Sequence, residues 1–326
     1  TKVTFTSAWE DYLEELRAGI SAKTKRPYST RYIADHINLS SRGGESKKRG
    51  RGPTSAGPLA SLLDLPLSEL TPENIAAWLS TERQNRPTVT AHAYRLLRAF
   101  IKWANYQKKY QGIIHGDIAQ DHNVRKVVPV SASKAGDCLQ KEQLKIWFSA
   151  VRSLNNPIAS AYLQVLLLTG ARREEIASLR WSDVDFKWSS MRIKDKIEGE
   201  RIIPLTPYVS ELLSALVQFP NSDVNKECWV FRSNSKSGKI IEPRSAHNRA
   251  LARAELPHIS LHGLRRSFGT LAEWVEVPTG IVAQIMGHKP SALAEKHYRR
   301  RPLDLLRKWH EKIERWILQQ ANIVKK

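Results

Sequence analysis

Helical periodicity is lost between Gly116 and Gly136, and this break divides the chain into two parts of different pattern. The stretch carries glycine, aspartate, serine and one proline in place of regularly spaced apolar residues, as interdomain linkers do. A chain of 326 residues is long enough for two domains. We therefore expect one domain over residues 1–115, a linker over 116–138 and a second domain over 139–326.

The first domain is expected to be entirely helical. In LTPENIAAWL, Thr71 suits the capping position of a helix and Pro72 its first turn. A longer helix follows over about 88–109, where apolar residues recur at helical spacing. Three cations of that helix fall outside the apolar stripe, namely Arg95, Arg98 and Lys102.

The second domain shows a mixed pattern. Helices expected over 140–153 and 157–168 precede short β-type runs at 190–195 and 201–205, and further helices continue to the C-terminus. The predicted fold is an N-terminal all-α domain followed by a C-terminal α+β domain that is mostly helical, with a small antiparallel sheet.

Charge restricts the class of partner. Lysine and arginine number 52 against 32 aspartates and glutamates, giving a formal charge of +20 and an isoelectric point near 10.0. A globular chain this basic most often neutralises nucleic acid. An anionic membrane is the alternative, but no apolar run approaches spanning length. Candidate DNA-binding residues are Arg95, Arg98 and Lys102, and the Gly/Ser-rich basic stretch 40–58 is expected to be a flexible loop that acts as a tether or touches DNA.

Cofactor signals are missing from the sequence. Cys138 and Cys228 are far apart and lack metal-type spacing, so we expect reduced thiols in a cytoplasmic protein. No acidic cluster has metal-ligand spacing, and no phosphate-binding P-loop occurs. We therefore expect neither a metal nor a nucleotide cofactor.

Two short motifs of the second domain each contain several charged or titratable residues. In TGARREEIASL a helix ends at Gly170 and another begins at once, with Glu175 three residues after Arg172, so that its carboxylate can hold the arginine. The alternative is a surface salt bridge, which contributes little. In SLHGLRRSFG, His262 and Arg265 share one helical face. That motif alone is equally typical of an amphipathic helix with a solvated basic side.

Three further residues complete the set. MRIKDKIEGERIIPL predicts a β-hairpin with Lys196 at the end of its first strand, where a lysine is ordinarily a surface residue. IVAQIMGHKP ends a helix at Gly287 and leaves His288 just beyond it. Tyr298 follows ten residues later among cations, in AEKHYRRR.

With its motifs in this order, the sequence resembles the tyrosine recombinases, the phage-integrase family. That family carries T-G-x-R-x-x-E-[IL], a hairpin lysine before an R-x-[IV]-P-L strand, H-x-L-R, a G-H pair and a tyrosine about ten residues on. The resemblance implies a helical core-binding domain over 1–115 and a catalytic domain over 139–326. It implies that the catalytic residues are Arg172, Lys196, His262, Arg265, His288 and Tyr298, with Glu175 in support. Asp195 and Ile197 depart from the usual neighbours of the hairpin lysine, so Lys194 is its rival.

The chemistry of these side chains agrees with phosphodiester exchange. Arginines and histidines can stabilise the charge on a pentavalent phosphate without a metal. Tyr298 would be the nucleophile, Lys196 the general acid for the 5′ oxygen, and a 3′-phosphotyrosyl link would conserve the bond energy without ATP. Gly269 would let a backbone approach closely.

The resemblance also implies partners. These are double-stranded DNA attachment sites, a homotetramer on synapsed DNA and accessory DNA-bending proteins, in the cytoplasm with the nucleoid and without a membrane. A type IB topoisomerase shares the catalytic logic, and a catalytically silent DNA-binding protein shares the fold, so both remain alternatives. The chain begins at Thr1, so whether an N-terminal arm-binding domain, present in some integrases, has been removed stays open.

The C-terminal segment RPLDLLRKWHEKIERWILQQ predicts an amphipathic helix over residues 301–320. Two placements are open. The helix either packs on its own domain or serves as an exchange helix that docks into a neighbouring subunit, as the resemblance implies.

Overall fold

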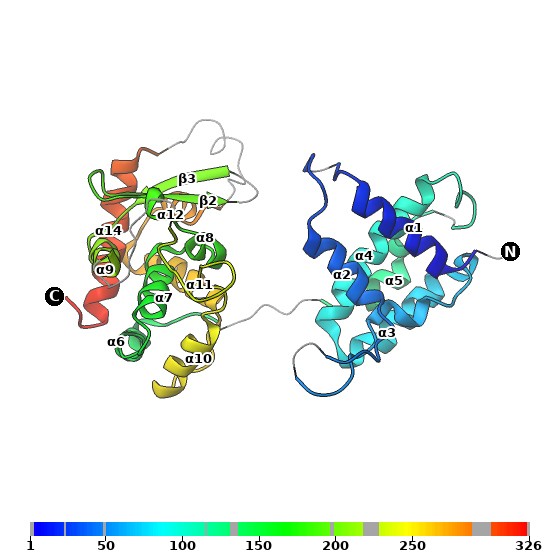
Figure 1. The fold of residues 1–326 in the computed structure, drawn as a ribbon, viewed down its shortest axis with the longest axis horizontal. Helices are drawn as coiled ribbons and strands as arrows, with labels where there is room; N and C mark the ends of the chain where they lie inside the picture. Colours follow the sequence, from blue (N-terminus) through cyan, green and yellow to red (C-terminus); the bar gives the residue numbers. More distant parts are fainter. Residues whose placement is uncertain are drawn as a thin grey trace. The chain divides into compact units, whose positions relative to one another are not determined.

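The computed structural model describes residues 3–22, 24–47, 50–114, 116–130, 136–195, 199–217, 228–288 and 301–324. The chain divides into two compact units, Thr1–Ser133 and Lys134–Lys326, each with its own hydrophobic core (Figure 1). None of the described helices is long and apolar enough to span a bilayer.

The N-terminal unit is all-α, as predicted. Thr71 caps its third helix by accepting a hydrogen bond from the Asn74 amide, and Pro72 occupies the first position. Stacked and tilted aromatic rings, among them Phe5, Trp9 and Phe100, fill the centre of the core. The helices are α1 (Phe5–Ala18), α2 (Thr30–Ser40), α3 (Pro72–Asn85), α4 (Pro87–Tyr106) and α5 (His122–Val127), with 3₁₀ turns at Pro58–Leu62, Leu67–Glu69 and Ile118–Gln120.

The basic face of α4 lies opposite its buried stripe. Arg95 and Lys102 are exposed and Arg98 is half-buried beside the Tyr94 ring, while Leu97 and Phe100 are fully buried on the other side. The three cations stand at i, i+3 and i+7 and therefore share one face, which is available to bind a polyanion.

Two stretches that were expected to lack regular structure contain short helices or paired backbone. Within 116–138 the chain forms a 3₁₀ turn and α5, which bury Ala119 and Val124 in the N-terminal core. A six-residue helix is too short for its apolar spacing to be seen in the sequence. Within 40–58 the backbone pairs with itself, through bonds from Gly44 N to Thr54 O at 2.9 Å and from Thr54 N to Glu45 O at 2.7 Å.

The C-terminal unit has the predicted mixed class. Its three strands form one antiparallel sheet in the order β1-β2-β3, with Ser190 opposite Pro204 and Asp195 opposite Gly199. The elements are α6 (Leu144–Arg152), α7 (Pro157–Thr169), α8 (Arg173–Ala177), β1 (Val184–Asp185), β2 (Ser190–Asp195), β3 (Gly199–Pro204), α9 (Pro207–Val217), α10 (Arg244–Arg253), α11 (Leu261–Ala272), α12 (Thr279–Met286) and α14 (Leu303–Gln320), with 3₁₀ turns at Lys141–Gln143, Trp181–Asp183 and Glu273–Val275.

Helix α7 is the centre of this unit. Every residue from Ala159 to Thr169 is buried, because α6, α9 and α11 pack around it. It ends at Gly170 in the left-handed conformation (φ 58°), which turns the chain directly into α8. A Cβ at position 170 would lie 2.5 Å from the Phe268 ring of α11, so the residue type is fixed by packing as well as by φ.

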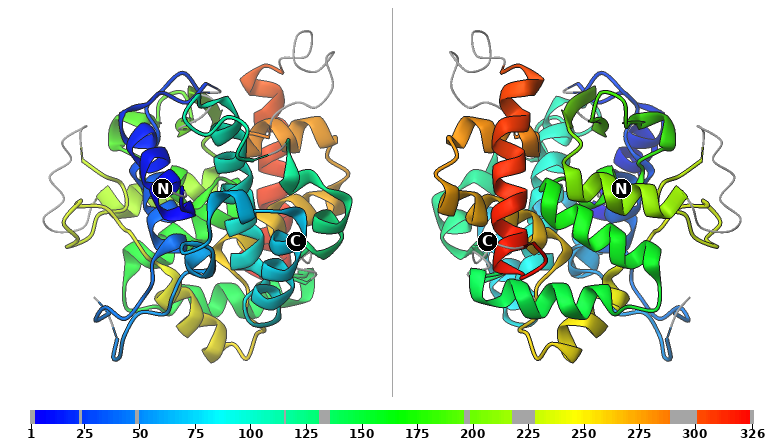
Figure 2. Two further views of the ribbon diagram at one scale, coloured as in Figure 1. Left: turned by 90° about the vertical axis from the view of Figure 1, so that its right-hand side faces the viewer. Right: turned by 90° about the vertical axis from the view of Figure 1, so that its left-hand side faces the viewer.

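Helix α14 packs on its own domain, which is the first of the two placements left open (red in Figure 2). Leu306, Ile313 and Ile317 belong to the same core as α7. The buried Glu314 carboxylate binds the Thr206 hydroxyl and accepts from the backbone N–H groups of Tyr208 and Val209 at 2.9 and 3.3 Å. Removing residues 303–326 would therefore open the core.

Two buried histidines make the stability of this unit depend on pH. Burial lowers the pKa of His310 to about 4, and burial, with the charge of His258 second, lowers that of His247 to about 4. In the unfolded chain both imidazoles would take up a proton near pH 6.5. The free energy of unfolding should therefore fall as the pH drops from about 6.5 to about 4, by about 3 kcal/mol for each histidine.

Denaturant unfolding followed by tryptophan fluorescence measures this dependence. His247→Gln offers a control, because its amide oxygen can still accept the bond that Trp147 donates to His247 Nε2 at 3.0 Å. The variant should lose the contribution of His247, about 3 kcal/mol between pH 6.5 and pH 4. An unchanged slope in the variant would contradict the assignment.

Candidate active site

The carboxylate of Glu175 organises the start of α8. Its Oε2 accepts from the backbone N–H of Arg172 at 2.7 Å, and its Oε1 accepts from the Arg172 guanidinium at 2.8 Å. The contact predicted at this spacing is thus present, and it is no surface salt bridge, since Glu175 is only 6% exposed. Arg172 is thereby held in one orientation before any substrate arrives.

Arg201 on β3 is the second cation on this carboxylate. It donates from Nη1 to Oε1 at 3.0 Å and from Nη2 to Oε2 at 2.8 Å. Burial alone would raise the pKa of Glu175, but the bonds and charge of Arg201, and then those of Arg172, outweigh it and hold the pKa below its ordinary value. Arg201 is not among the site residues predicted above, although it is the arginine of the R-x-[IV]-P-L strand.

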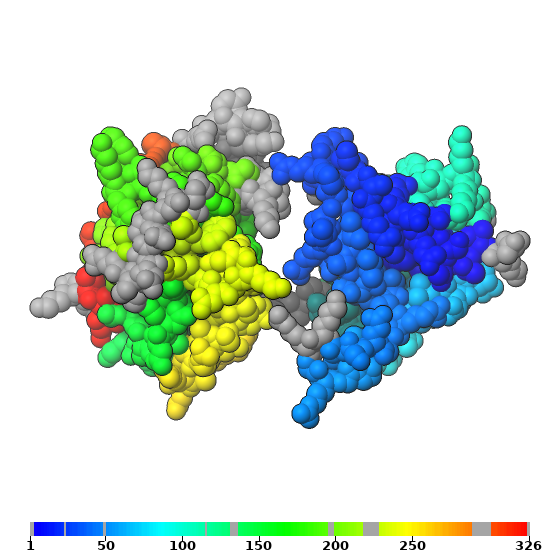
Figure 3. All heavy atoms as spheres, in the orientation of Figure 1, coloured from blue at the N-terminus to red at the C-terminus, as the bar shows by residue number. Residues whose placement is uncertain are grey.

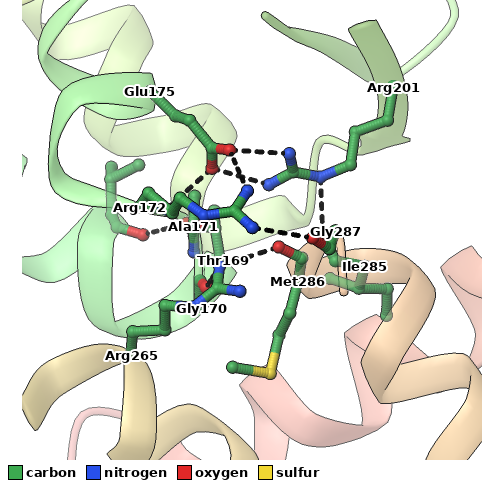
Figure 4. Close-up of polar contacts among 11 residues, drawn as sticks. Thr169, Gly170, Ala171, Arg172, Glu175, Arg201, Arg265, Ile285, Met286 and Gly287 are labelled. Carbon is green, nitrogen blue, oxygen red and sulfur yellow. Dashed lines mark hydrogen bonds and ion pairs between the residues drawn. The ribbon is translucent and has the colours of Figure 1, made fainter. Parts of the chain in front are cut away.

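The carbonyl end of α12 binds three arginines from three different elements (Figure 4). The last carbonyls of a helix lack intrahelical partners and carry partial negative charge, so cations are stabilised there. The bonds run from Arg201 Nε to Ile285 O at 3.1 Å, from Arg265 Nη1 to Met286 O at 2.7 Å and from Arg172 Nη2 to Gly287 O at 3.1 Å.

Two left-handed glycines make this arrangement possible. Arg265, which is 4% exposed, also donates to the carbonyl of Gly170 at 2.8 Å, so the end of α7 fixes it from a second side. Gly287 has φ 72°, and a Cβ there would lie 2.6 Å from the Arg201 guanidinium. Any other residue at position 287 would displace the arginine or the helix end.

Two histidines complete a cleft of about 770 Å³, which is lined by Arg172, His262, Arg265 and His288 together with residues of α11 and α12. Burial, followed by the charges of Arg266 and Arg265, lowers the pKa of His262. Burial, followed by the charges of Arg265 and Arg172, lowers that of His288. Both imidazoles are therefore neutral at neutral pH, and each can accept a proton or donate a hydrogen bond.

Asp137 positions the helix that carries His262 and Arg265. Its Oδ1 accepts from the Ser260 backbone N–H and its Oδ2 from the Ser260 hydroxyl, both at 2.7 Å, while Ser260 caps α11. Arg266 also binds this carboxylate. Nothing in the sequence pattern indicates this contact, because its two sides lie 123 residues apart.

Of the six predicted catalytic residues, the structure brings together Arg172, His262, Arg265 and His288. Lys196 and Tyr298 lie outside the described residues. The rival Lys194 is paired at 2.7 Å with Asp183, whose side chain is buried.

Gly269 lines the cleft, and a Cβ there would meet only the Met286 side chain at ordinary contact distance, so packing within the protein does not require this glycine. Among the described residues, no group of three histidine, cysteine, aspartate or glutamate side chains could hold a metal ion.

The comparisons with known proteins agree on one family. The model described as "Phage integrase core-binding domain" matches residues 4–126, and that described as "Phage integrase family" matches residues 138–302. The chain belongs to the phage integrase family. It is therefore a tyrosine-type integrase, a site-specific recombinase.

One relative shares nearly the whole sequence of this integrase. The prophage integrase IntF of Escherichia coli (strain K12) is 92% identical over 323 residues, which cover 99% of this chain and 69% of that protein.

Solved structures share the fold. A lambda integrase (75–356) dimer bound to a COC′ core site has a TM-score of 0.63 at 16% identity, over 92% of this chain and 100% of that one. A lambda integrase tetramer bound to a Holliday junction has a TM-score of 0.63 at 17% identity, over 92% and 80%.

Removing Arg201 should destabilise the fold as well as the site, because Glu175 would keep its buried charge with one cation fewer. Arg201→Ala is expected to lower the free energy of unfolding by about 3 kcal/mol, the size typical of a broken buried ion pair. Denaturant unfolding measures this. The matched control is Arg192→Ala, a half-exposed arginine of the same sheet paired with Glu200 at 3.7 Å, which should cost well under 1 kcal/mol. Equal losses in the two variants would contradict the role given to Arg201.

Proposed function

We propose that this integrase cuts and rejoins DNA through a 3′-phosphotyrosyl intermediate, with Tyr298 as the nucleophile. The observation that carries the proposal is the convergence of Arg172, Arg265, His262 and His288 on one cleft. Two guanidinium groups held in place by protein bonds, beside two neutral imidazoles, form a site for a phosphodiester whose charge increases during reaction. In this scheme the stabilising charge comes from side chains.

The position of Tyr298 in the sequence supports its role. Gln284 of α12 binds the backbone of Arg301 on both sides, donating to its carbonyl at 3.0 Å and accepting from its N–H at 3.3 Å. Tyr298 precedes this bound residue by three positions in the sequence. Gln284 stands on α12, the helix whose end binds the arginines, so the sequence position of Tyr298 is close to a residue attached to that helix.

The proposed reaction is balanced without a further reagent. The Tyr298 oxygen attacks phosphorus and gives its proton to a neutral histidine of the cleft, and the bond to the 5′ oxygen breaks. Lys196 supplies a proton to that oxygen as general acid. In the second half the 5′ hydroxyl of a partner strand attacks the phosphotyrosyl link and releases Tyr298, so the number of phosphodiester bonds is conserved.

The proposed substrate is double-stranded attachment-site DNA, bound by both units and recombined by a homotetramer. The lambda integrase structures support this assembly, because that protein was captured as a dimer on a core site and as a tetramer on a Holliday junction. Arg95, Arg98 and Lys102 on α4 would contact phosphates from the N-terminal unit, and the work would take place in the cytoplasm with the nucleoid. Membership of the phage integrase family favours recombination over the activity of a type IB topoisomerase. Formation of a covalent protein–DNA adduct would distinguish an active recombinase from a catalytically silent DNA-binding protein.

Tyr298→Phe removes the attacking oxygen and leaves the DNA-binding surface unchanged. With a nicked duplex carrying the attachment core, the unaltered chain should form a covalent protein–DNA adduct, visible as a band that survives denaturing electrophoresis. The variant should bind the duplex with similar affinity and form no adduct. An adduct in the variant would refute Tyr298 as nucleophile, and its absence from the unaltered chain would favour the silent alternative.

Arg172→Ala should slow adduct formation by about 10²–10³-fold, as loss of one preorganised donor does. Affinity for the duplex should change far less, because many other phosphate contacts remain. Single-turnover cleavage at saturating DNA measures the rate, and Arg249→Ala, an exposed arginine of α10, is the matched control. A near-normal cleavage rate in Arg172→Ala would indicate that the role of this residue is purely structural.

A further inference from the structure

The cleft of the proposed active site continues on the other side of Arg172 and His262. A second hollow of about 630 Å³ is lined by Arg172, His262 and Arg265, and also by Arg173, Glu174, Arg244 and His258. This hollow thus carries two guanidinium groups that the first cleft lacks, from the first residues of α8 and α10. Helix α10 lies on the surface of its unit, where it can be reached (yellow in Figure 3).

These two outer arginines converge on one carboxylate oxygen. Glu242 Oε2 lies 3.6 Å from Arg173 Nη1 and 3.5 Å from Arg244 Nη2. Its other oxygen accepts from the backbone N–H of Arg244, the first residue of α10, at 3.1 Å. A single anionic group therefore receives two guanidinium groups and a helix N-terminus, which is the donor set that binds phosphate in proteins.

The carboxylate is held weakly. Both ion-pair distances exceed those of a direct charge-assisted hydrogen bond, and the Glu242 side chain is 48% exposed. Exposed pairs of this kind contribute little to stability. In contrast, Arg173 is oriented independently of Glu242, because its Nη2 donates to Glu174 at 2.8 Å. A ligand anion could displace Glu242 and find Arg173 already in place.

We propose that Arg173 and Arg244 bind the DNA phosphate next to the one cleaved, and that Glu242 occupies this phosphate site in the DNA-free protein. The inference rests on the proposed function, since the hollow adjoins the cleft through Arg172 and His262. Because a duplex must displace the Glu242 carboxylate, that side chain weakens binding. It keeps two like charges together when no DNA is present and disfavours any ligand that lacks a phosphate at this position.

The test compares DNA affinities in a Tyr298→Phe background, so that cleavage does not interfere. Glu242→Gln removes the charge but keeps an amide oxygen that can accept from Arg244 N–H. We expect it to bind the attachment-site duplex roughly threefold to tenfold more tightly. Glu211→Gln is the control, because it makes the same change of net charge at an exposed position of α9, a helix that carries neither Arg173 nor Arg244. Equal tightening by both variants would overturn the proposal.

Two further experiments test whether the effect of Glu242 acts through this site. In an Arg173→Gln/Arg244→Gln background, the gain from Glu242→Gln should disappear, while it should persist with Arg253→Gln at the far end of α10. An uncharged methylphosphonate placed at one of the two phosphates flanking the scissile one should also abolish the gain. A gain that survives loss of both arginines, or of both flanking charges, would overturn the proposal. Thermal unfolding checks that each variant is folded.

The binding series separates this proposal from the proposed function. It needs no covalent chemistry, so it can succeed even if Tyr298 is not the nucleophile. Conversely, adduct formation by the unaltered chain can succeed while Glu242→Gln behaves like its control, which would leave the reaction intact and remove only the second phosphate site.

Discussion

The three carbonyl groups at the end of α12 are the contact on which the active site depends. Arginines from the N-cap of α8, from β3 and from α11 meet there, and three positive charges placed so close would repel one another strongly in a partly buried site. The helix end and the buried Glu175 offset that repulsion. The site can therefore form only when α7, α8, β3, α11 and α12 are all packed in their places, so its chemistry is coupled to the folding of the whole unit.

This coupling suits a recombinase. Strand exchange replaces one phosphodiester bond by another, so the enzyme needs little driving force and must instead stabilise the same charged geometry in both directions. Arginines fixed by protein bonds do this without rearranging at each step. The neutral histidines add groups that can take up and return a proton, and the lowered pKa of each follows from burial and from the same cluster of arginines.

Motif spacing together with the family resemblance predicted several of the side chains that meet in the cleft, but not what holds them. Arg172, Glu175, His262, Arg265 and His288 could be named because short motifs fix their local geometry and the family resemblance fixes their order. Arg201 was overlooked because a lone arginine in a strand is ordinarily a surface residue. Asp137 could not be found, since its contact joins positions far apart in the chain. Helix α5 was missed because one and a half turns leave too few apolar positions to reveal a period.

The bonds between Gln284 and Arg301, together with the burial of α14, have a consequence for the continuity of the chain. Arg301, three positions after Tyr298 in the sequence, is bound to Gln284 of α12. The helix that follows is part of the hydrophobic core. A single cut in the polypeptide before Tyr298 would therefore leave the C-terminal piece attached without a covalent bond. The proposed nucleophile and the arginines of the cleft could then be supplied as two fragments that assemble into one protein.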